Sequence, residues 1–222
     1  EALSHMQAAL DAYYIRGVSH NIGFLAALVA HPKFAAGDTT TNFIADEYPD
    51  GFHPQDLPSE DPTIQIAVAA SVHRAYQQRA AEISGQTPDH ERQVSDDWVV
   101  VLKDGEHPVT VRVAADGFFV IIEGTTHELQ TDWKLGETLM RGNLDGRNIC
   151  IQVERQNISY RLTHAGSQDD ILVLSPRHAE LNTHMLVKEP PDTSKLLLSP
   201  MPGLLVSVAV ESGQEIKSGE EL

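Results

Sequence analysis

The sequence predicts an α+β fold in which an antiparallel up-and-down β-barrel of about eight strands surrounds a long central helix. From residue 98 to residue 175 apolar residues alternate with polar ones, and Asp-Gly and similar pairs separate the runs, as in strands joined by tight turns. Residues 63–84 contain neither Gly nor Pro, and their first half is apolar on nearly every side. A helix of that kind is buried all round, so we expect it to fill the barrel.

Residues 1–50 are predicted to be helical. The apolar residues that would share one face of a first helix are Leu3, Met6, Leu10, Tyr13 and Tyr14. This helix should end at Gly17, a second should run from Asn21 to just before Pro32, and a third is expected within 39–48. Three short helices form a poor core by themselves, so we expect this segment to complete a larger domain.

Residues 51–61 are rich in proline and acidic side chains, which indicates an exposed linker. Asp61 is a suitable N-cap for the central helix, and Pro62 fits its first position. The helix should cover residues 62–84 and end at Gly85. Its second half is amphipathic and should emerge from the barrel.

The strands of the expected barrel, over residues 98–175, are separated by recurrent turn pairs. They are Asp104-Gly105, Asp116-Gly117, Glu123-Gly124, Asp145-Gly146 and Ala165-Gly166. Helix and barrel together form one expected domain over 62–187, with a short helix from Arg177 to Met185. A linker over 188–195 and a last segment with a strand pattern over 196–222 follow.

The composition limits the function. Lys and Arg total 16 against 32 Asp and Glu, for a net charge of −16, so we expect no nucleic-acid or anionic-membrane partner, since both need clustered cations. The apolar runs are too short to span a bilayer. A lone cysteine, Cys150, excludes an intrachain disulfide and suits a reducing compartment. Because the chain begins at Glu1, inside a helical pattern, we expect a fragment of a longer protein.

No motif for catalysis stands out. The eleven histidines form no HxH or HxxxH pair, and neither GxGxxG nor GxxxxGK[ST] occurs. Cys150 lies in an alternating strand and is interpreted as a passive thiol. The pairs Asp96-Asp97 and Asp169-Asp170 are interpreted as solvated residues at loop–strand boundaries. We therefore predict no catalytic, cofactor-binding or metal-binding residues, and a scaffold rather than an enzyme site.

Two segments resemble parts of known domains. Met201-Pro202-Gly203, a Leu/Val strand and the run from Glu211 to Glu220 resemble the first half of a biotinyl domain. That resemblance implies that the biotin-bearing lysine lies beyond Leu222, since Lys217 falls in an earlier turn. RGVSHNIGFLAALVAHPKF, followed by GDTTTNFIADEYPDGF, resembles the tail of a biotin carboxylase domain.

The order of these segments resembles the α subunits of biotin-dependent acyl-CoA carboxylases, and the stretch from Tyr48 through the barrel is most similar to propionyl-CoA carboxylase α subunits. The resemblance implies a biotin carboxylase tail over 1–50, an interaction (BT) domain over 62–187 and the start of a biotinyl domain over 196–222. In that family the BT domain is a barrel around a helix. It holds the biotin carboxylase half against a carboxyltransferase β subunit.

The resemblance further implies a role in a ligase. Biotin would be attached to the full-length protein, and its biotin carboxylase domain would use ATP and Mg. The holoenzyme would carboxylate propionyl-CoA to methylmalonyl-CoA with bicarbonate, while 3-methylcrotonyl-CoA or a broad acyl-CoA range remains open. The segment itself would be inactive. A bacterial cytoplasm is expected, with the mitochondrial matrix as the alternative.

A different class of function also remains open: an eight-stranded barrel is typical of lipocalin-like carriers of small ligands. A lumen that is not filled by the helix would favour it.

The connection over 84–97 is longer than most in compact domains, which suggests a functional loop. A disordered surface loop is the alternative. We predict that it docks on the β subunit, through side chains and backbone of Gln86, Thr87, Pro88, His90, Arg92 and Gln93. The next candidate surface is Arg177–Met185.

Overall fold

The computed structural model describes residues 2–55, 57, 62–186, 204, 207–210 and 213–215. Residues 1–184 form one compact unit, and residues 185–222 form a second. In the described part of the second unit, no residue lies in a helix or strand. The predicted linker over 188–195, most of the predicted strand pattern over 196–222 and the proposed cap Asp61 lie outside the described residues.

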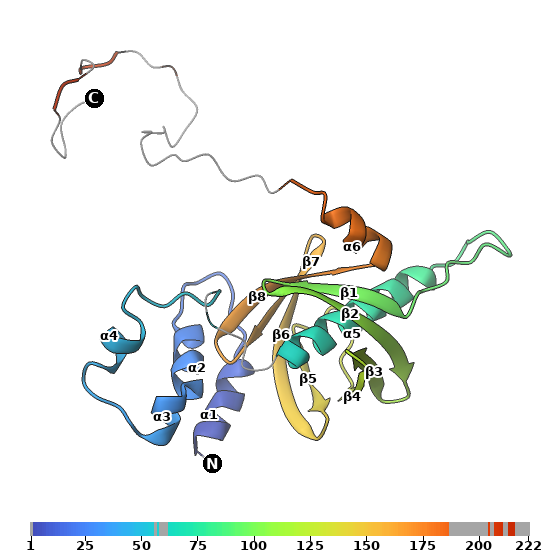
Figure 1. Ribbon diagram of the computed structural model, residues 1–222, viewed down its shortest axis with the longest axis horizontal. Coiled ribbons are helices and arrows are strands. Elements are labelled where there is room, and N and C mark those ends of the chain that lie inside the picture. The colour runs from blue at the N-terminus through green and yellow to red at the C-terminus, as the bar shows by residue number, and fades with distance from the viewer. Residues whose placement is uncertain are drawn as a thin grey trace. The chain divides into compact units, whose positions relative to one another are not determined.

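Eight antiparallel strands follow one another around a closed barrel (Figure 1). They are β1 (Asp97–Leu102), β2 (Gly105–Ala114), β3 (Gly117–Ile122), β4 (Thr125–Thr131), β5 (Leu139–Leu144), β6 (Arg147–Gln156), β7 (Ser159–His164) and β8 (Ser167–Leu174). The barrel closes where β1 pairs with β8 and Val99 lies opposite Leu174. The predicted barrel of about eight strands is therefore confirmed.

All five predicted turn pairs lie where one strand gives way to the next. In three of them a non-glycine residue with positive φ precedes the glycine: Glu123 at 49°, Asp145 at 52° and Ala165 at 50°. Two successive left-handed residues twist the chain in the same sense as the strands. This geometry explains why the alternating pattern of the sequence closes into neighbouring antiparallel pairs.

Helix α5 (Pro62–Ala81) runs through the barrel, and its first half is enclosed. Ile64 is 3% exposed, while Val68 and Val72 are fully buried. They pack against inward strand residues such as Val111 and Ile171, both fully buried. The predicted central helix is confirmed. Because its side chains fill the lumen, the lipocalin-like alternative is wrong.

The helix ends at Ala81 rather than at the predicted Ser84. The physical reason is that the Gln86 side chain, rather than a following backbone N–H, bonds to carbonyl groups at the end of the helix. The amide nitrogen of Gln86 donates to the carbonyl oxygens of Ala81 and Ile83, and Gly85 takes a left-handed φ of 84°. Together these contacts turn the chain back at this point.

The N-terminal segment forms four helices, α1 (Ala2–Asp11), α2 (Ile22–Ala30), α3 (Pro32–Ala36) and α4 (Phe43–Glu47). The predicted first helix is too long, because α1 ends at Asp11 and not at Gly17. Its predicted apolar face is also not the buried one: Met6 is 52% and Tyr13 61% exposed. The buried residue is Asp11, which bonds to the barrel, so tertiary contacts override the helical pattern here.

Short aromatic contacts join the N-terminal helices to the segment that follows them. Phe24 of α2 lies 5.5 Å from Tyr48 and 5.4 Å from Phe52, ring centre to ring centre. The backbone of the same segment reaches β8, where the N–H of Gln168 donates to the carbonyl of Pro54 at 3.1 Å. The N-terminal segment is thus folded against the barrel.

After β8 a short helix, α6 (Pro176–Asn182), begins at Ser175, whose hydroxyl accepts a hydrogen bond from the His178 N–H. The helix ends at Asn182, before the predicted Met185. No helix in the described part of the chain combines the length and the apolar content that a membrane span requires.

Candidate partner-binding site

The connection between α5 and β1, residues 82–96, projects beyond the end of the barrel (Figure 1); we name it the hook. The side chains of Thr87, Pro88, His90 and Gln93 are exposed, whereas Gln86 is half-buried. A projecting polar loop of this kind is suited to contact another protein.

The tip of the hook is a tight turn. The N–H of His90 donates to the carbonyl of Thr87 at 3.0 Å. Between them Pro88 occupies the position where proline presets φ, and Asp89 has a φ of +65°. This is the pattern of a type II turn, in which the third position has positive φ. The tip is therefore compact, with Asp89 in a conformation that glycine adopts more readily.

The base of the hook is held by side chains. The Gln86 amide oxygen accepts the backbone N–H of Arg92 at 2.7 Å, which joins the outgoing and returning limbs. The Arg92 guanidinium donates to the amide oxygen of Gln77 in α5. Arg74 of the same helix lies 3.5 Å from Asp96, measured from Nε to Oδ1.

The structure thus divides the six predicted residues into two groups. Half-buried Gln86 and exposed Arg92 bond within the chain. Thr87, Pro88, His90 and Gln93 are exposed as well, and their side chains make none of these bonds. Two exposed neighbours, Asp89 and Glu91, were missed by the sequence prediction. The positive φ that Asp89 adopts could not be read from the residue type.

The second predicted surface, Arg177–Met185, coincides largely with α6. Its exposed apolar side chains are Leu181, at 46%, and Met185, at 72%. Arg177 pairs with Glu180 of the same helix at 2.6 Å.

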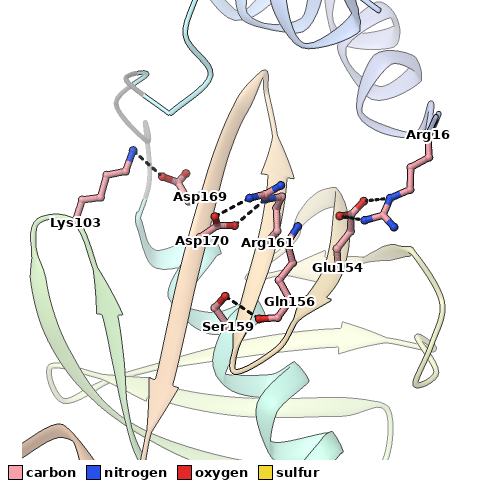
Figure 2. Close-up of polar contacts among 8 residues, drawn as sticks. All are labelled: Arg16, Lys103, Glu154, Gln156, Ser159, Arg161, Asp169 and Asp170. Atoms are coloured by element: carbon pink, nitrogen blue, oxygen red, sulfur yellow. Dashed lines mark hydrogen bonds and ion pairs between the residues drawn. The ribbon is translucent and has the colours of Figure 1, made fainter. Parts of the chain in front are cut away.

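Polar contacts cross the outer face of the barrel from β6 to β8 (Figure 2). The Arg161 guanidinium of β7 donates to both carboxylate oxygens of Asp170 in β8 at 2.7 Å, and this holds the pKa of Asp170 below its usual value. At one end of the row, Arg16 pairs with Glu154 of β6. The Arg16–Glu154 pair ties the N-terminal segment to the barrel surface.

Asp169 and Asp170 lie inside β8, so their predicted place at a loop–strand boundary is wrong. Asp170 is exposed to solvent as predicted, whereas Asp169 is half-buried. Asp169 accepts a hydrogen bond from the Gln65 amide of α5 at 2.7 Å and lies 3.8 Å from the Lys103 ammonium. Burial raises the pKa of Asp169. Asp97, in contrast, does mark the start of β1.

Asp11 makes a second tie between the N-terminal segment and the barrel. Its carboxylate, 6% exposed, accepts the N–H of Ala165 at 2.9 Å and lies 3.4 Å from Nδ1 of His164. Its backbone carbonyl accepts the amide of Gln152 at 3.1 Å. Burial raises the pKa of Asp11, although His164 and Gln7 act in the opposite direction.

A cavity of about 1180 Å³ lies away from the hook, between the N-terminal helices and one end of the barrel. Cys150 lines it, but burial raises the pKa of its thiol, which makes it a poor nucleophile. Among the described residues, no three His, Cys, Asp or Glu side chains are grouped as metal ligands would be.

Residues 66–188 match the family described as propionyl-coenzyme A carboxylase BT domain. The chain belongs to this BT domain family. The matched stretch contains nearly all of α5, the hook, all eight strands and α6. Residues 1–46 match a second family, the biotin carboxylase C-terminal domain.

Relatives of the BT domain chain lie in bacteria and eukaryotes. Over its whole length it is 41% identical to a propionyl-CoA carboxylase alpha chain of Ruegeria pomeroyi and 34% identical to the mitochondrial one of Mus musculus. It is 25% identical to a mitochondrial methylcrotonoyl-CoA carboxylase subunit alpha of Dictyostelium discoideum. It spans 33%, 31% and 33% of these relatives' lengths. The chain therefore corresponds to about a third of each relative.

Proposed function

We propose that this BT domain chain is the scaffold part of a biotin-dependent acyl-CoA carboxylase α chain. In this role it holds the biotin carboxylase half against a carboxyltransferase β subunit and carries no catalytic residue. The observation that carries the proposal is the hook, a hydrogen-bonded arm that projects from a barrel whose lumen is filled. A filled barrel with a rigid arm is suited to position proteins and leaves no space for a ligand in the lumen.

The domain assignment is part of the proposal. Residues 1–50 are assigned to the end of a biotin carboxylase domain, which the family match over 1–46 supports. Residues 51–61 and 188–195 are assigned to linkers, and 196–222 to the start of a biotinyl domain. The ties at Asp11 and Arg16 support a rigid junction between the carboxylase tail and the barrel.

The holoenzyme would convert propionyl-CoA, bicarbonate and ATP to methylmalonyl-CoA, ADP and phosphate. Biotin, attached to a lysine beyond Leu222, would carry the carboxyl group, and ATP and Mg would act in the biotin carboxylase domain. Tethering raises the effective concentration of biotin at both centres. The contribution of this chain is geometric, because it fixes the distance between the two centres.

The test uses the full-length α chain co-expressed with its carboxyltransferase β subunit. Residues 86–93 are replaced by a short Gly/Ser turn, and the complex is isolated through a tag on the β subunit. We expect the α chain to be lost from the complex while the barrel melts at an unchanged temperature. A complex of unchanged affinity would place the docking surface elsewhere, with α6 as the next candidate.

The acyl substrate has a second candidate, since a methylcrotonoyl-CoA carboxylase subunit is among the relatives. Carboxylation rates of the holoenzyme with propionyl-CoA, 3-methylcrotonyl-CoA and acetyl-CoA would decide between a narrow and a broad enzyme. A bacterial cytoplasm is proposed as the location because the Ruegeria relative has the higher identity of those named. Fractionation of the source cells would test it against the mitochondrial matrix.

A further inference from the structure

A chain of hydrogen bonds connects the hook to the inside of the barrel. The Arg92 guanidinium donates to Oε1 of Gln77. The amide nitrogen of Gln77 lies 3.1 Å from Nε2 of His73, and Nδ1 of His73 lies 3.1 Å from the Tyr160 hydroxyl of β7. Since Tyr160 is 3% exposed, the chain ends in the core.

The donors and acceptors along this chain are mutually consistent. Because Gln77 accepts from Arg92 through its oxygen, its NH₂ group is the end that faces His73. The imidazole must then accept at Nε2 and donate from Nδ1 to the Tyr160 hydroxyl. This requires a neutral His73, in agreement with its lowered pKa of about 4, which burial and the cations Arg155 and Arg92 produce.

The returning limb of the hook also follows α5 in antiparallel order. Asp96 lies beside Arg74 and Arg92 beside Gln77, while Gln86 reaches back to Ala81. The contacts are spaced along the second half of the helix. The hook is thus held to α5 at three points, and none of the polar contacts that the structure describes for α5 involves the tip, residues 87–91.

We propose that Gln77 and His73 are positioning residues for partner binding: through Arg92 they fix the direction of the hook, and the tip makes the contact with the carboxyltransferase β subunit. This inference rests on the proposed function. A loop that is already ordered loses less conformational entropy when it binds. We call the hydrogen-bond chain from Arg92 through Gln77 to His73 the brace. Loss of the brace should weaken binding to the β subunit, although no residue of the tip has changed.

Gln77→Leu tests the brace, because leucine has nearly the same size and offers no hydrogen bond. The matched control is Gln78→Leu. Gln78 bonds to Arg74 of the same helix and to Glu82 just after it, and neither Arg92 nor His73 is among these partners. The variants are made in the full-length α chain, and affinity for the β subunit is measured together with amide exchange of residues 84–96 and barrel melting.

For Gln77→Leu we expect about tenfold weaker binding, which corresponds to about 1.4 kcal/mol, and faster exchange in the hook. Gln78→Leu should bind within twofold of the wild type. Gln77→Glu should restore binding, since a carboxylate accepts from Arg92 and imidazole can reverse its tautomer to donate from Nε2. This rescue separates the brace from a general loss of stability.

Two results would overturn the inference. One is binding by Gln77→Leu within twofold of the wild type; the other is a Gln77→Glu variant as weak as Gln77→Leu. The Gly/Ser replacement of residues 86–93 distinguishes failure of the brace from failure of docking through the hook. If that replacement abolishes binding while Gln77→Leu does not affect it, the hook docks on the β subunit but Gln77 and His73 do not position it. If the replacement leaves binding intact, docking through the hook is wrong as well.

Discussion

Gly166, in the turn between β7 and β8, lies directly against Ala27 of helix α2. A Cβ atom at Gly166 would be 2.5 Å from the backbone nitrogen of Ala27 and 2.5 Å from the carbonyl oxygen of Gly23. These are backbone atoms, which cannot move aside without displacing the helix. This glycine therefore lets the turn of the barrel approach α2 of the N-terminal segment closely.

Gly166→Ala should consequently destabilise the chain strongly. Part of the cost is the positive φ of 83°, and the larger part is the collision with α2. We expect a loss of at least about 2 kcal/mol beyond the cost of the φ angle alone, measured as the free energy of unfolding in urea.

Gly146→Ala is the matched control for this substitution. Gly146 has a φ of 86° in an equivalent turn, but a Cβ there meets no atom within 4 Å. It should cost only about 1 kcal/mol, from the backbone conformation. Equal costs for the two variants would show that α2 does not pack against the turn as described.

Val68→Asp tests the enclosure of α5. Val68 is fully buried in the barrel, and an unpaired carboxylate there would have neither water nor a counter-ion. We expect a loss of about 4 kcal/mol, visible as a large fall in melting temperature. Val113→Asp, near the end of β2 with 58% exposure, should cost less than about 1 kcal/mol because water reaches this position. A Val68→Asp variant that melts within a degree or two of the wild type would contradict the enclosed helix.

Ser71→Ala should stabilise the barrel. The Ser71 hydroxyl is fully buried on α5 and has no hydrogen-bond partner among the described residues. A buried hydroxyl without a hydrogen bond destabilises the folded state by its desolvation penalty, and the substitution removes that penalty. Alanine also has a higher helix propensity than serine. We expect a gain of about 1 kcal/mol, read from the urea midpoint. A loss of similar size would mean that the hydroxyl is bonded in solution.

His73 should make stability depend on pH in the acid range. Its pKa falls from 6.5 to about 4 in the folded chain, so between these values the unfolded chain binds a proton that the folded chain does not. The free energy of unfolding therefore falls as pH is lowered through this window, by at most about 3 kcal/mol. At pH 7 and above the full stability is present.

The measurement compares urea unfolding of the wild type and of His73→Phe at several pH values. The raised pKa values of Asp11 and Asp169 act in the opposite direction but are common to both proteins. The difference between the two curves therefore isolates His73. Parallel curves between pH 6.5 and pH 4 would show that His73 titrates normally and is not held neutral by the barrel.

The sequence by itself determined the elements that depend on local pattern. Alternating residues and turn pairs such as Asp145-Gly146 define antiparallel neighbours, because side-chain period and turn twist are local properties. The helix around Val68 is apolar on nearly every side, and this pattern predicted that the barrel encloses it, since such a helix has no polar face to turn toward water. The barrel, its central helix and the location of the long connection followed from these signals.

Tertiary structure alone decided where the N-terminal segment lies and how the hook is held. Asp11, a polar residue at the end of a helix, is buried because the N–H of Ala165, far away in sequence, donates to it. Gln86 and Arg92 are polar loop residues whose partners depend on how the chain turns after Ala81. Hydrogen bonds between distant residues leave no periodic signal, so sequence patterns identified the exposed loop but not the contacts that fix it.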